Sequence, residues 1–177
     1  MVTLRFAVLA AALGCAGIPS LALAQDVPLS AMAPADEYFG HARLSVLGIA
    51  NTIRDAGARI REGADPQSMT GGPLSFIPDA ISDWEHRYPD DPWIARDLFG
   101  LELVYLRAQT PEGDGMARKT ADWLIQDYPD SEAAQNARLA LHRDGHGLGR
   151  NVARSGGGDA WERWNALRAP LPPGGPN

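Results

Sequence analysis

Two histidines are the first side chains in this sequence whose type and spacing could support chemistry. His142 and His146 are four residues apart, a spacing that can place two metal ligands on one face of a helix. Asp144 and Gly145 lie between them and are typical of a helix end, and no third ligand is evident nearby. We therefore expect a solvated helix end here, with no metal and no other cofactor.

Carboxylates are the second group with a spacing that could support chemistry. Four of them flank two Tyr-Pro turns, namely Asp90, Asp91, Asp127 and Asp130. Such residues cap the free N–H groups of a following helix and offset its dipole, which explains them without acid–base catalysis. Glu112 and Asp114 lie in a predicted turn, where nothing places a partner carboxylate opposite them. The sequence also has no phosphate-binding glycine loop, G-x-S-x-G elbow or zinc-protease helix, so we do not expect an enzyme.

The N-terminus has the three-part pattern of a secretory signal peptide. Residues 1–5 form a short n-region made basic by Arg5, residues 6–18 are apolar, and Ala22-Leu23-Ala24 is a small-x-small site with cleavage after Ala24. The apolar run is shorter than the roughly 20 residues that span a membrane. The pattern predicts a periplasmic or secreted protein and favours it over a lipoprotein anchored at Cys15. Because Cys15 is the sole cysteine, the exported chain would have no disulfide and no thiol chemistry.

The charge distribution limits the classes of partner. Residues 25–138 hold 19 acidic and 10 basic side chains, a net charge of −9, whereas residues 139–177 hold 3 and 5, a net charge of +2. Non-specific nucleic-acid binding needs a basic surface, so this acidic body argues against it. We expect no nucleic-acid partner, and no integral membrane span in the mature chain.

Apolar residues recur every three or four positions along five stretches, which is the spacing of one helix face. They predict helices over 36–62, 77–88, 92–107, 114–128 and 131–143. Within the first stretch, Gly40 and Gly48 weaken the pattern, and a break near 40–45 with Ser45 as a new N-cap stays open. No stretch alternates with a period of two, so we predict an all-α fold without strands.

The remaining segments divide the chain further. Residues 25–35 predict an extended lead-in, and residues 144–158 a glycine-rich linker. Residues 159–168 predict a short helix, because Asp159 and Glu162 form a capping-box-like start and Trp161 and Trp164 share one face. Residues 169–177 are rich in proline and glycine and predict a disordered tail.

The turn sequence YPDD at 88–91 returns as YPDS at 128–131, 40 residues later. Superposing the two turns pairs apolar or aromatic residues on both flanking helices: Ile77 with Ala117, Ile81 with Ala121, Trp84 with Leu124, Tyr88 with Tyr128, Ile94 with Ala134, and Leu101 with Leu141. Repeats on this scale are typical of arrays of helical hairpins, in which one hairpin cannot bury its apolar face alone.

The segment of about residues 77–141 resembles the tetratricopeptide-like repeats of periplasmic proteins, especially those of outer-membrane assembly lipoproteins and cell-division coordinators. The Trp or Leu before each Tyr-Pro turn, the turns themselves, and the small Ala134 and Ala137 carry the resemblance. The 40-residue unit departs from the usual length of about 34, Asp97 stands where the second copy has Ala137, and Arg138 stands opposite Leu98. The resemblance implies two to three stacked antiparallel hairpins over 36–143, in a right-handed array with a C-terminal capping helix.

For function, the resemblance implies only protein–protein binding, because such repeats serve many partners. The groove would be lined by the first helix of each hairpin, over 36–62, 92–107 and 131–143. Its candidate contact residues are Arg43, Trp93, Arg96, Glu102 and Arg138. We expect an interaction module that binds an envelope protein or peptide.

Two other functions remain open from the sequence. The first is a structural protein that forms a homodimer by pairing the apolar stripe of residues 39–60 with that of a second copy. The second is an enzyme of unknown reaction, for which the sequence offers no catalytic residues.

Overall fold

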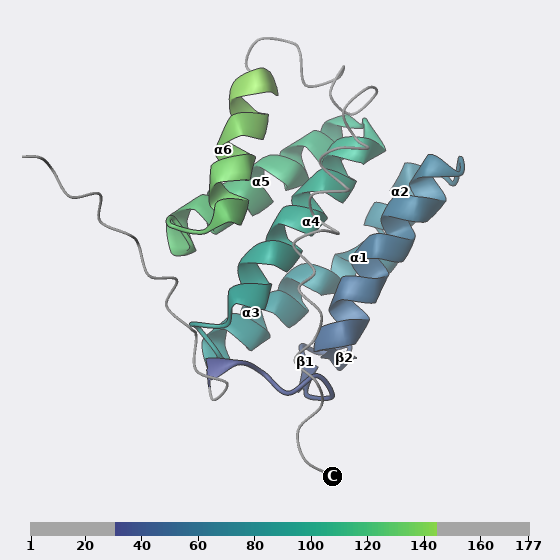
Figure 1. Ribbon diagram of the computed structural model, residues 1–177. Helices are drawn as coiled ribbons and strands as arrows, with labels where there is room; N and C mark the ends of the chain where they lie inside the picture. The colour runs from purple at the N-terminus through teal and green to yellow at the C-terminus, as the bar shows by residue number, and fades with distance from the viewer. Residues whose placement is uncertain (1–30, 145–177) are drawn as a thin grey trace, which may run out of the picture.

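A computed structural model describes residues 31–144, and helices dominate this part of the chain (Figure 1). The elements in chain order are β1 (Tyr38–Phe39), β2 (Leu44–Ser45), α1 (Val46–Arg61), α2 (Pro66–Thr70), η2 (Pro73–Phe76), α3 (Ile77–Arg87), α4 (Pro92–Ala108), α5 (Pro111–Asp127) and α6 (Glu132–Asp144). The prediction of a mostly helical fold is confirmed. The prediction of no strand is wrong, because β1 and β2 form a short antiparallel pair.

Local sequence explains where most of the helices begin. The side chains of Ser45, Asp91 and Thr110 each accept a hydrogen bond from a backbone N–H in the first turn of α1, α4 and α5, respectively. Helices α3, α4 and α5 each have a proline in the first turn, where a missing N–H costs nothing. Helix α4 ends at Gln109, which adopts the left-handed conformation with φ 53° and turns the chain into α5.

The first long helix was predicted to begin at Asp36, but α1 begins only at Val46. The alternative break is confirmed, since Ser45 caps α1 by accepting a hydrogen bond from the N–H of Gly48 at 3.0 Å. Upstream, Gly40 has φ 66° and backs so closely onto α3 that a Cβ would lie 2.8 Å from the Cα of Ala80. A helix cannot adopt this backbone, so a turn replaces the first predicted helical turns.

Helix α4 lies at the centre of the fold and contacts α1, α3, α5 and α6. In Figure 1, α1 lies on one side of α4 and α6 on the other. One apolar core runs through these elements, with fully buried side chains that include Ile49, Ile53, Trp84, Leu98 and Leu124. Within residues 31–144, no helix combines the length and apolar character needed to cross a membrane.

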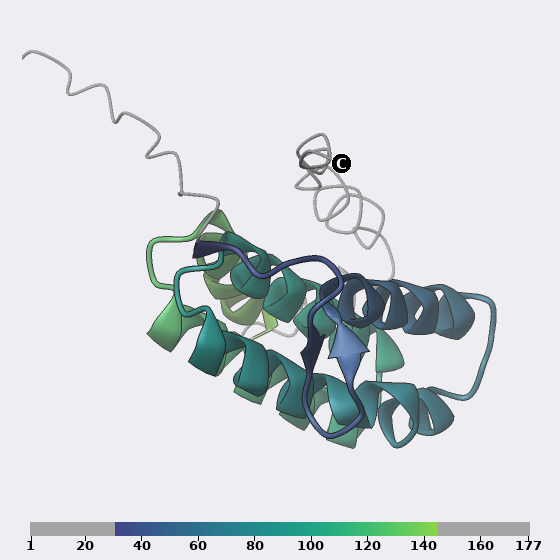
Figure 2. The same ribbon diagram turned by 90° about the horizontal axis from the view of Figure 1, so that it is seen from below.

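Residues 31–45, which we call the N-terminal strap, run across α3 and reach the start of α4 (Figure 2). The aromatic ring of Phe39 is its apolar anchor and is 0% exposed. This ring stacks on Trp84 at 5.7 Å between centroids, meets Tyr88 edge-on at 6.2 Å, and lies under the guanidinium of Arg87 at 4.1 Å. Aromatic and cation–π contacts of this kind fix the position of the strap on α3.

Two carboxylates of α3 hold the turn of the strap. Asp83 accepts a hydrogen bond from the backbone N–H of Gly40, and Asp79 accepts one from that of His41, both at 2.8 Å. The pKa of Asp79 lies below its ordinary value of 3.8, chiefly because of the bond from the His41 backbone. The pKa of Asp83 is lowered chiefly by the bond from Gly40, with Arg87 adding to the effect.

Asp91 joins three segments through one buried carboxylate that is 1% exposed. Its Oδ1 accepts from the backbone N–H of Trp93 at 3.0 Å, which caps α4. Its Oδ2 accepts from the indole N–H of Trp84 on α3 at 3.0 Å and from the backbone N–H of Ala33 on the strap at 2.9 Å. Burial raises the pKa of Asp91, and the three hydrogen bonds oppose that shift.

Several predicted segments lie outside the described residues. These are the signal peptide over 1–24, most of the lead-in over 25–35, most of the linker over 144–158, the short helix over 159–168 and the tail over 169–177. His146 also lies outside them. The segment 63–76, between the first two predicted helices, contains α2 and η2.

We predict that Asp91→Ala lowers the free energy of unfolding by about 3 kcal/mol, because it removes a helix cap and leaves the buried indole N–H of Trp84 without an acceptor. Asp91→Ser gives this turn the serine that Ser131 supplies in the second turn, so a helix cap remains. The single hydroxyl of the serine cannot also reach Trp84, and we expect the free energy of unfolding to fall by about 2 kcal/mol. Urea denaturation followed by circular dichroism measures both. The exposed Asp90→Ala serves as the control, with a change within about 0.5 kcal/mol; a similar small change at Asp91 would contradict the three-way contact.

We also predict that acid releases the turn of the strap from α3. Because the pKa values of Asp79 and Asp83 are lowered by folding, their contribution to stability is fully present above the unfolded value of 3.8. It is lost as the pH falls through the folded values. Hydrogen exchange of the Gly40 and His41 amides, measured by NMR, reports this release. In the control, Asp79→Ala with Asp83→Ala, these amides have no protection relative to an unstructured chain at any pH; unchanged protection of the original protein down to pH of about 2 would contradict the prediction.

Candidate functional site

Two of the five predicted contact residues come together on the first two turns of α4. The guanidinium of Arg96 lies over the indole ring of Trp93 at 4.0 Å from the ring centroid. The i, i+3 spacing on a helix brings the two side chains to the same face, and the cap at Asp91 fixes where that helix begins. Trp93 is half-buried, so part of the ring faces solvent. The stacked pair combines an aromatic surface with a positive charge.

Arg96 also anchors a buried carboxylate. Its Nε and one terminal nitrogen both donate to Oδ1 of Asp97, at 2.9 Å and 2.7 Å. Asp97 is 0% exposed and Arg96 is 9% exposed. Buried ion pairs are sensitive to the loss of either partner, because the remaining charge stays out of water. Arg96 therefore has a structural role within α4 in addition to its contact with Trp93.

The structure buries Glu102, which was predicted to line an open groove. Its side chain is 1% exposed, as part of a helix that α1, α2, α3, α5 and α6 all contact. The sequence pattern placed Glu102 off the apolar stripe of α4, but a central helix is covered around most of its circumference. Glu102 and Arg96 are therefore not presented as open surface groups.

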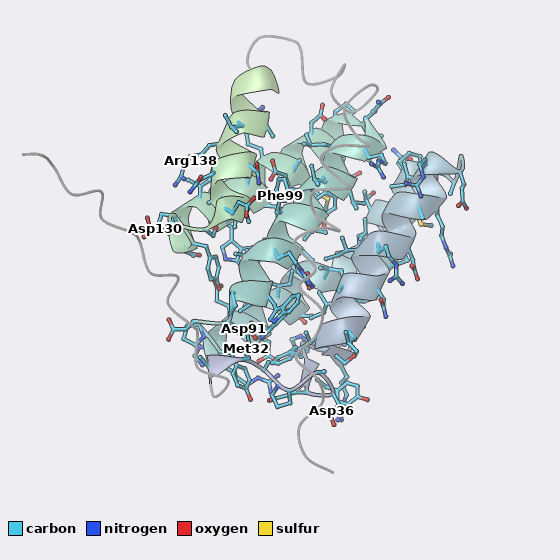
Figure 3. The ribbon with its side chains drawn as sticks, viewed as in Figure 1. Met32, Asp36, Asp91, Phe99, Asp130 and Arg138 are labelled. Atoms are coloured by element: carbon cyan, nitrogen blue, oxygen red, sulfur yellow. The ribbon has the colours of Figure 1, made fainter. Side chains whose placement is uncertain are left out.

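Arg43 and Arg138 lie on elements far from the Trp93–Arg96 pair in sequence. Arg43 is exposed on the turn of the strap, where its guanidinium lies 5.9 Å from the ring centroid of Tyr38. Arg138 belongs to α6 and donates to the carbonyl of Pro129 at 3.0 Å. Figure 3 shows Arg138 on the side of α6 that faces away from α4. The five residues therefore do not converge on one site, although α4 and α6 are in contact.

Sequence reasoning missed the polar contacts of two tryptophans. The indole N–H of Trp123 on α5 donates to Glu85 on α3 at 3.1 Å. The bond from Trp84 to Asp91 was missed in the same way, although the YPDD turn did identify Asp91 as a cap. Among the buried tyrosines, desolvation raises the pKa of Tyr105 to about 12.

Among residues 31–144, no group of three His, Cys, Asp or Glu side chains is placed to hold a metal ion. The most exposed pair of chemical interest is His41 with Asp79, whose Nδ1 and Oδ2 lie 3.0 Å apart on the strap and α3. Its carboxylate also accepts from the backbone N–H of His41, so the pair holds the turn in place. Of the three predicted contact residues on α4, only Trp93 is partly open to solvent.

We predict that Arg96→Ala lowers the free energy of unfolding by about 3 kcal/mol, because Asp97 then loses the partner that donates two of its hydrogen bonds. Arg138→Ala removes one bond to a carbonyl at the protein surface and should cost less than about 1 kcal/mol. Thermal and urea unfolding measure both variants. Equal, small effects would show that the Arg96–Asp97 pair adds nothing to stability.

The comparisons with known proteins identify no relative for this fold. No protein-family model matches the chain, and no curated protein or solved structure matches it. The assignment of a function therefore depends on the residues and contacts described above.

Proposed function

We propose that this protein is an exported protein-binding module built from tetratricopeptide-like helical hairpins. The observation that carries the proposal is the equivalence of the two Tyr-Pro-Asp segments. Residues 81–90 and 121–130 have the same helix end, the same turn and the same burial class at each position. Six apolar or aromatic pairs at the same offset had suggested this repeat from the sequence. Repeats of this kind form extended surfaces whose common use is to bind other proteins.

The order of contacts between helices supports an array. Helix α1 contacts α4, and α4 contacts α6, so the first helices of successive hairpins are neighbours. Helix α3 contacts α4, and α5 contacts α6, so each second helix packs against the next first helix. The bond from Trp123 to Glu85 links the second helices α5 and α3. These are the nearest-neighbour contacts that a stack of hairpins requires.

The recognition surface that we propose has two separate parts, one at Trp93 on α4 and one at Arg138 on α6. The half-buried Trp93, which stacks on the buried Arg96, supplies an aromatic anchor, and Arg138 supplies a positive charge. Trp and Arg are the residue types that contribute most binding energy at protein interfaces. The partner would be an envelope protein or peptide that presents acidic and apolar side chains. The signal peptide pattern of the sequence supports a location of this interaction in the periplasm or outside the cell.

The alternative of self-association through the stripe of residues 39–60 has weaker physical support. Phe39, Ile49 and Ile53 are each 0% exposed and pack in the core of a single chain. Pairing through these side chains would require that core to open. We therefore favour binding to a different protein.

Affinity capture from cell-envelope extracts with mild crosslinking tests the proposal. We expect a reproducible partner whose affinity falls about tenfold or more with Trp93→Ala and with Arg138→Glu. Arg118→Glu makes the same charge change at an exposed position on α5 and serves as the matched control, with unchanged capture. Circular dichroism checks that each variant is folded. If no partner is captured reproducibly, or if all three variants behave alike, the proposed surface is wrong.

A further inference from the structure

The strap lies against α3 in the position that a preceding helix would occupy if the repeat continued toward the N-terminus. In the second unit, Glu85 of α3 is the neighbour of Tyr128, whose pKa is raised first by burial and then by that carboxylate. In the first unit, the equivalent Tyr88 donates its hydroxyl to Glu37, which belongs to the strap. Glu37 of the strap thus takes beside Tyr88 the place that Glu85 of α3 takes beside Tyr128. It covers an outer face of α3 that is built to pack against another element.

The strap is joined to the rest of the chain by a tight and strained turn. Gly40 and Arg43 both have positive φ, at 66° and 53°, and the N–H of Arg43 closes the turn by donating to the carbonyl of Gly40 at 3.1 Å. Glycine adopts this backbone readily, but an arginine does so at a cost. Short connections under strain favour exchange of the segment that they join, because an extended connection removes the strain.

The contacts that residues 33–40 make with α3, α4 and β2 can all form between two chains as well as within one. Residues 33–40 bind α3 and the start of α4 through Phe39, Glu37 and three backbone groups. Strand β1 also pairs with β2, with Tyr38 opposite Ser45. None of these contacts uses the covalent link through residues 41–43. A strap from a second copy would therefore find the same partners in the same geometry.

We propose that two copies of this chain exchange their straps. In the dimer, residues 33–40 of each copy dock on α3 of the other, and residues 41–43 become an extended hinge in which Arg43 no longer needs a positive φ. Phe39 of one copy then completes the core of the other. The proposal is independent of the binding function proposed above, because it involves α3 and not the surface on α4 and α6. Domain swapping of this kind forms a dimer with few new contacts and depends on protein concentration.

Two substitutions at Arg43 test the hinge. Arg43→Gly relaxes the closed turn, and we expect it to lower the association constant of the dimer about tenfold or more. Arg43→Val places a β-branched side chain at positive φ, and we expect a rise of similar size. Both variants lose the contact of Arg43 with Tyr38, so they form a matched pair. Light scattering over a range of concentrations measures the dimer. Equal dimer fractions in the two variants, or monomers throughout, would overturn the proposal.

A cysteine pair distinguishes strap exchange from any other dimer. Tyr38→Cys with Ser45→Cys places two thiols opposite each other in β1 and β2, in a chain that also carries Cys15→Ser. The pair is oxidised in Arg43→Val after dimers have formed. Exchanged straps give a covalent dimer on a non-reducing gel, whereas monomers give only an intrachain disulfide. Dimers whose disulfides are all within one chain would overturn the proposal.

Discussion

The carboxylate of Asp91 is the interaction on which the arrangement of this fold depends. It accepts hydrogen bonds from the strap, from the indole of α3 and from the first turn of α4, and it is almost fully buried. An isolated buried carboxylate is costly, so the three donors must be present together. The position of Asp91 therefore fixes three separate segments at once. Figure 3 shows Asp91 and Met32 close together at the place where the strap meets α4.

The second constraint is that α4 has neighbours on nearly all sides. Helices that are covered all round normally contain apolar residues only, yet α4 buries Arg96, Asp97 and Glu102. Arg96 and Asp97 reduce this cost by pairing at 2.7 Å. The superposition of the two Tyr-Pro-Asp segments shows where the buried charge is an addition, because Asp97 corresponds to Ala137 of α6, which is also fully buried. One copy of the unit buries a charge where the other buries a methyl group.

The sequence predicted the elements whose cause is local. Periodicity and prolines located α3, α4 and α6 to within one residue at most ends, and Ser45 was foreseen as an alternative N-cap. The predicted start of the first helix was wrong, because Phe39 fits the apolar stripe of residues 46–60 by its spacing alone. What moves Phe39 onto α3 is the set of carboxylates at Asp79 and Asp83, and their bonds to residues about 40 positions away leave no local pattern.

Less of the candidate site was predictable, because part of it depends on contacts between residues that are distant in sequence. The i, i+3 spacing of Trp93 and Arg96 was sufficient to place them side by side. The burial of Glu102 could not be predicted from the sequence, because it depends on how many helices surround α4. The apolar pattern of a single helix reports only one of its faces.

The two copies of the repeat therefore differ mainly where the protein needs something other than packing. The Tyr-Pro-Asp turns and the apolar positions before them serve the same purpose in both units. Asp91 and Ser131 cap corresponding helices, but only Asp91 also holds an indole and the strap. Asp97 stands where the second copy buries Ala137, and its partner Arg96 stands where that copy has the half-buried Asn136. Because buried charges of this kind weaken a fold unless they are paired, α4 depends on the pairing of Arg96 with Asp97, a requirement that Ala137 removes from α6.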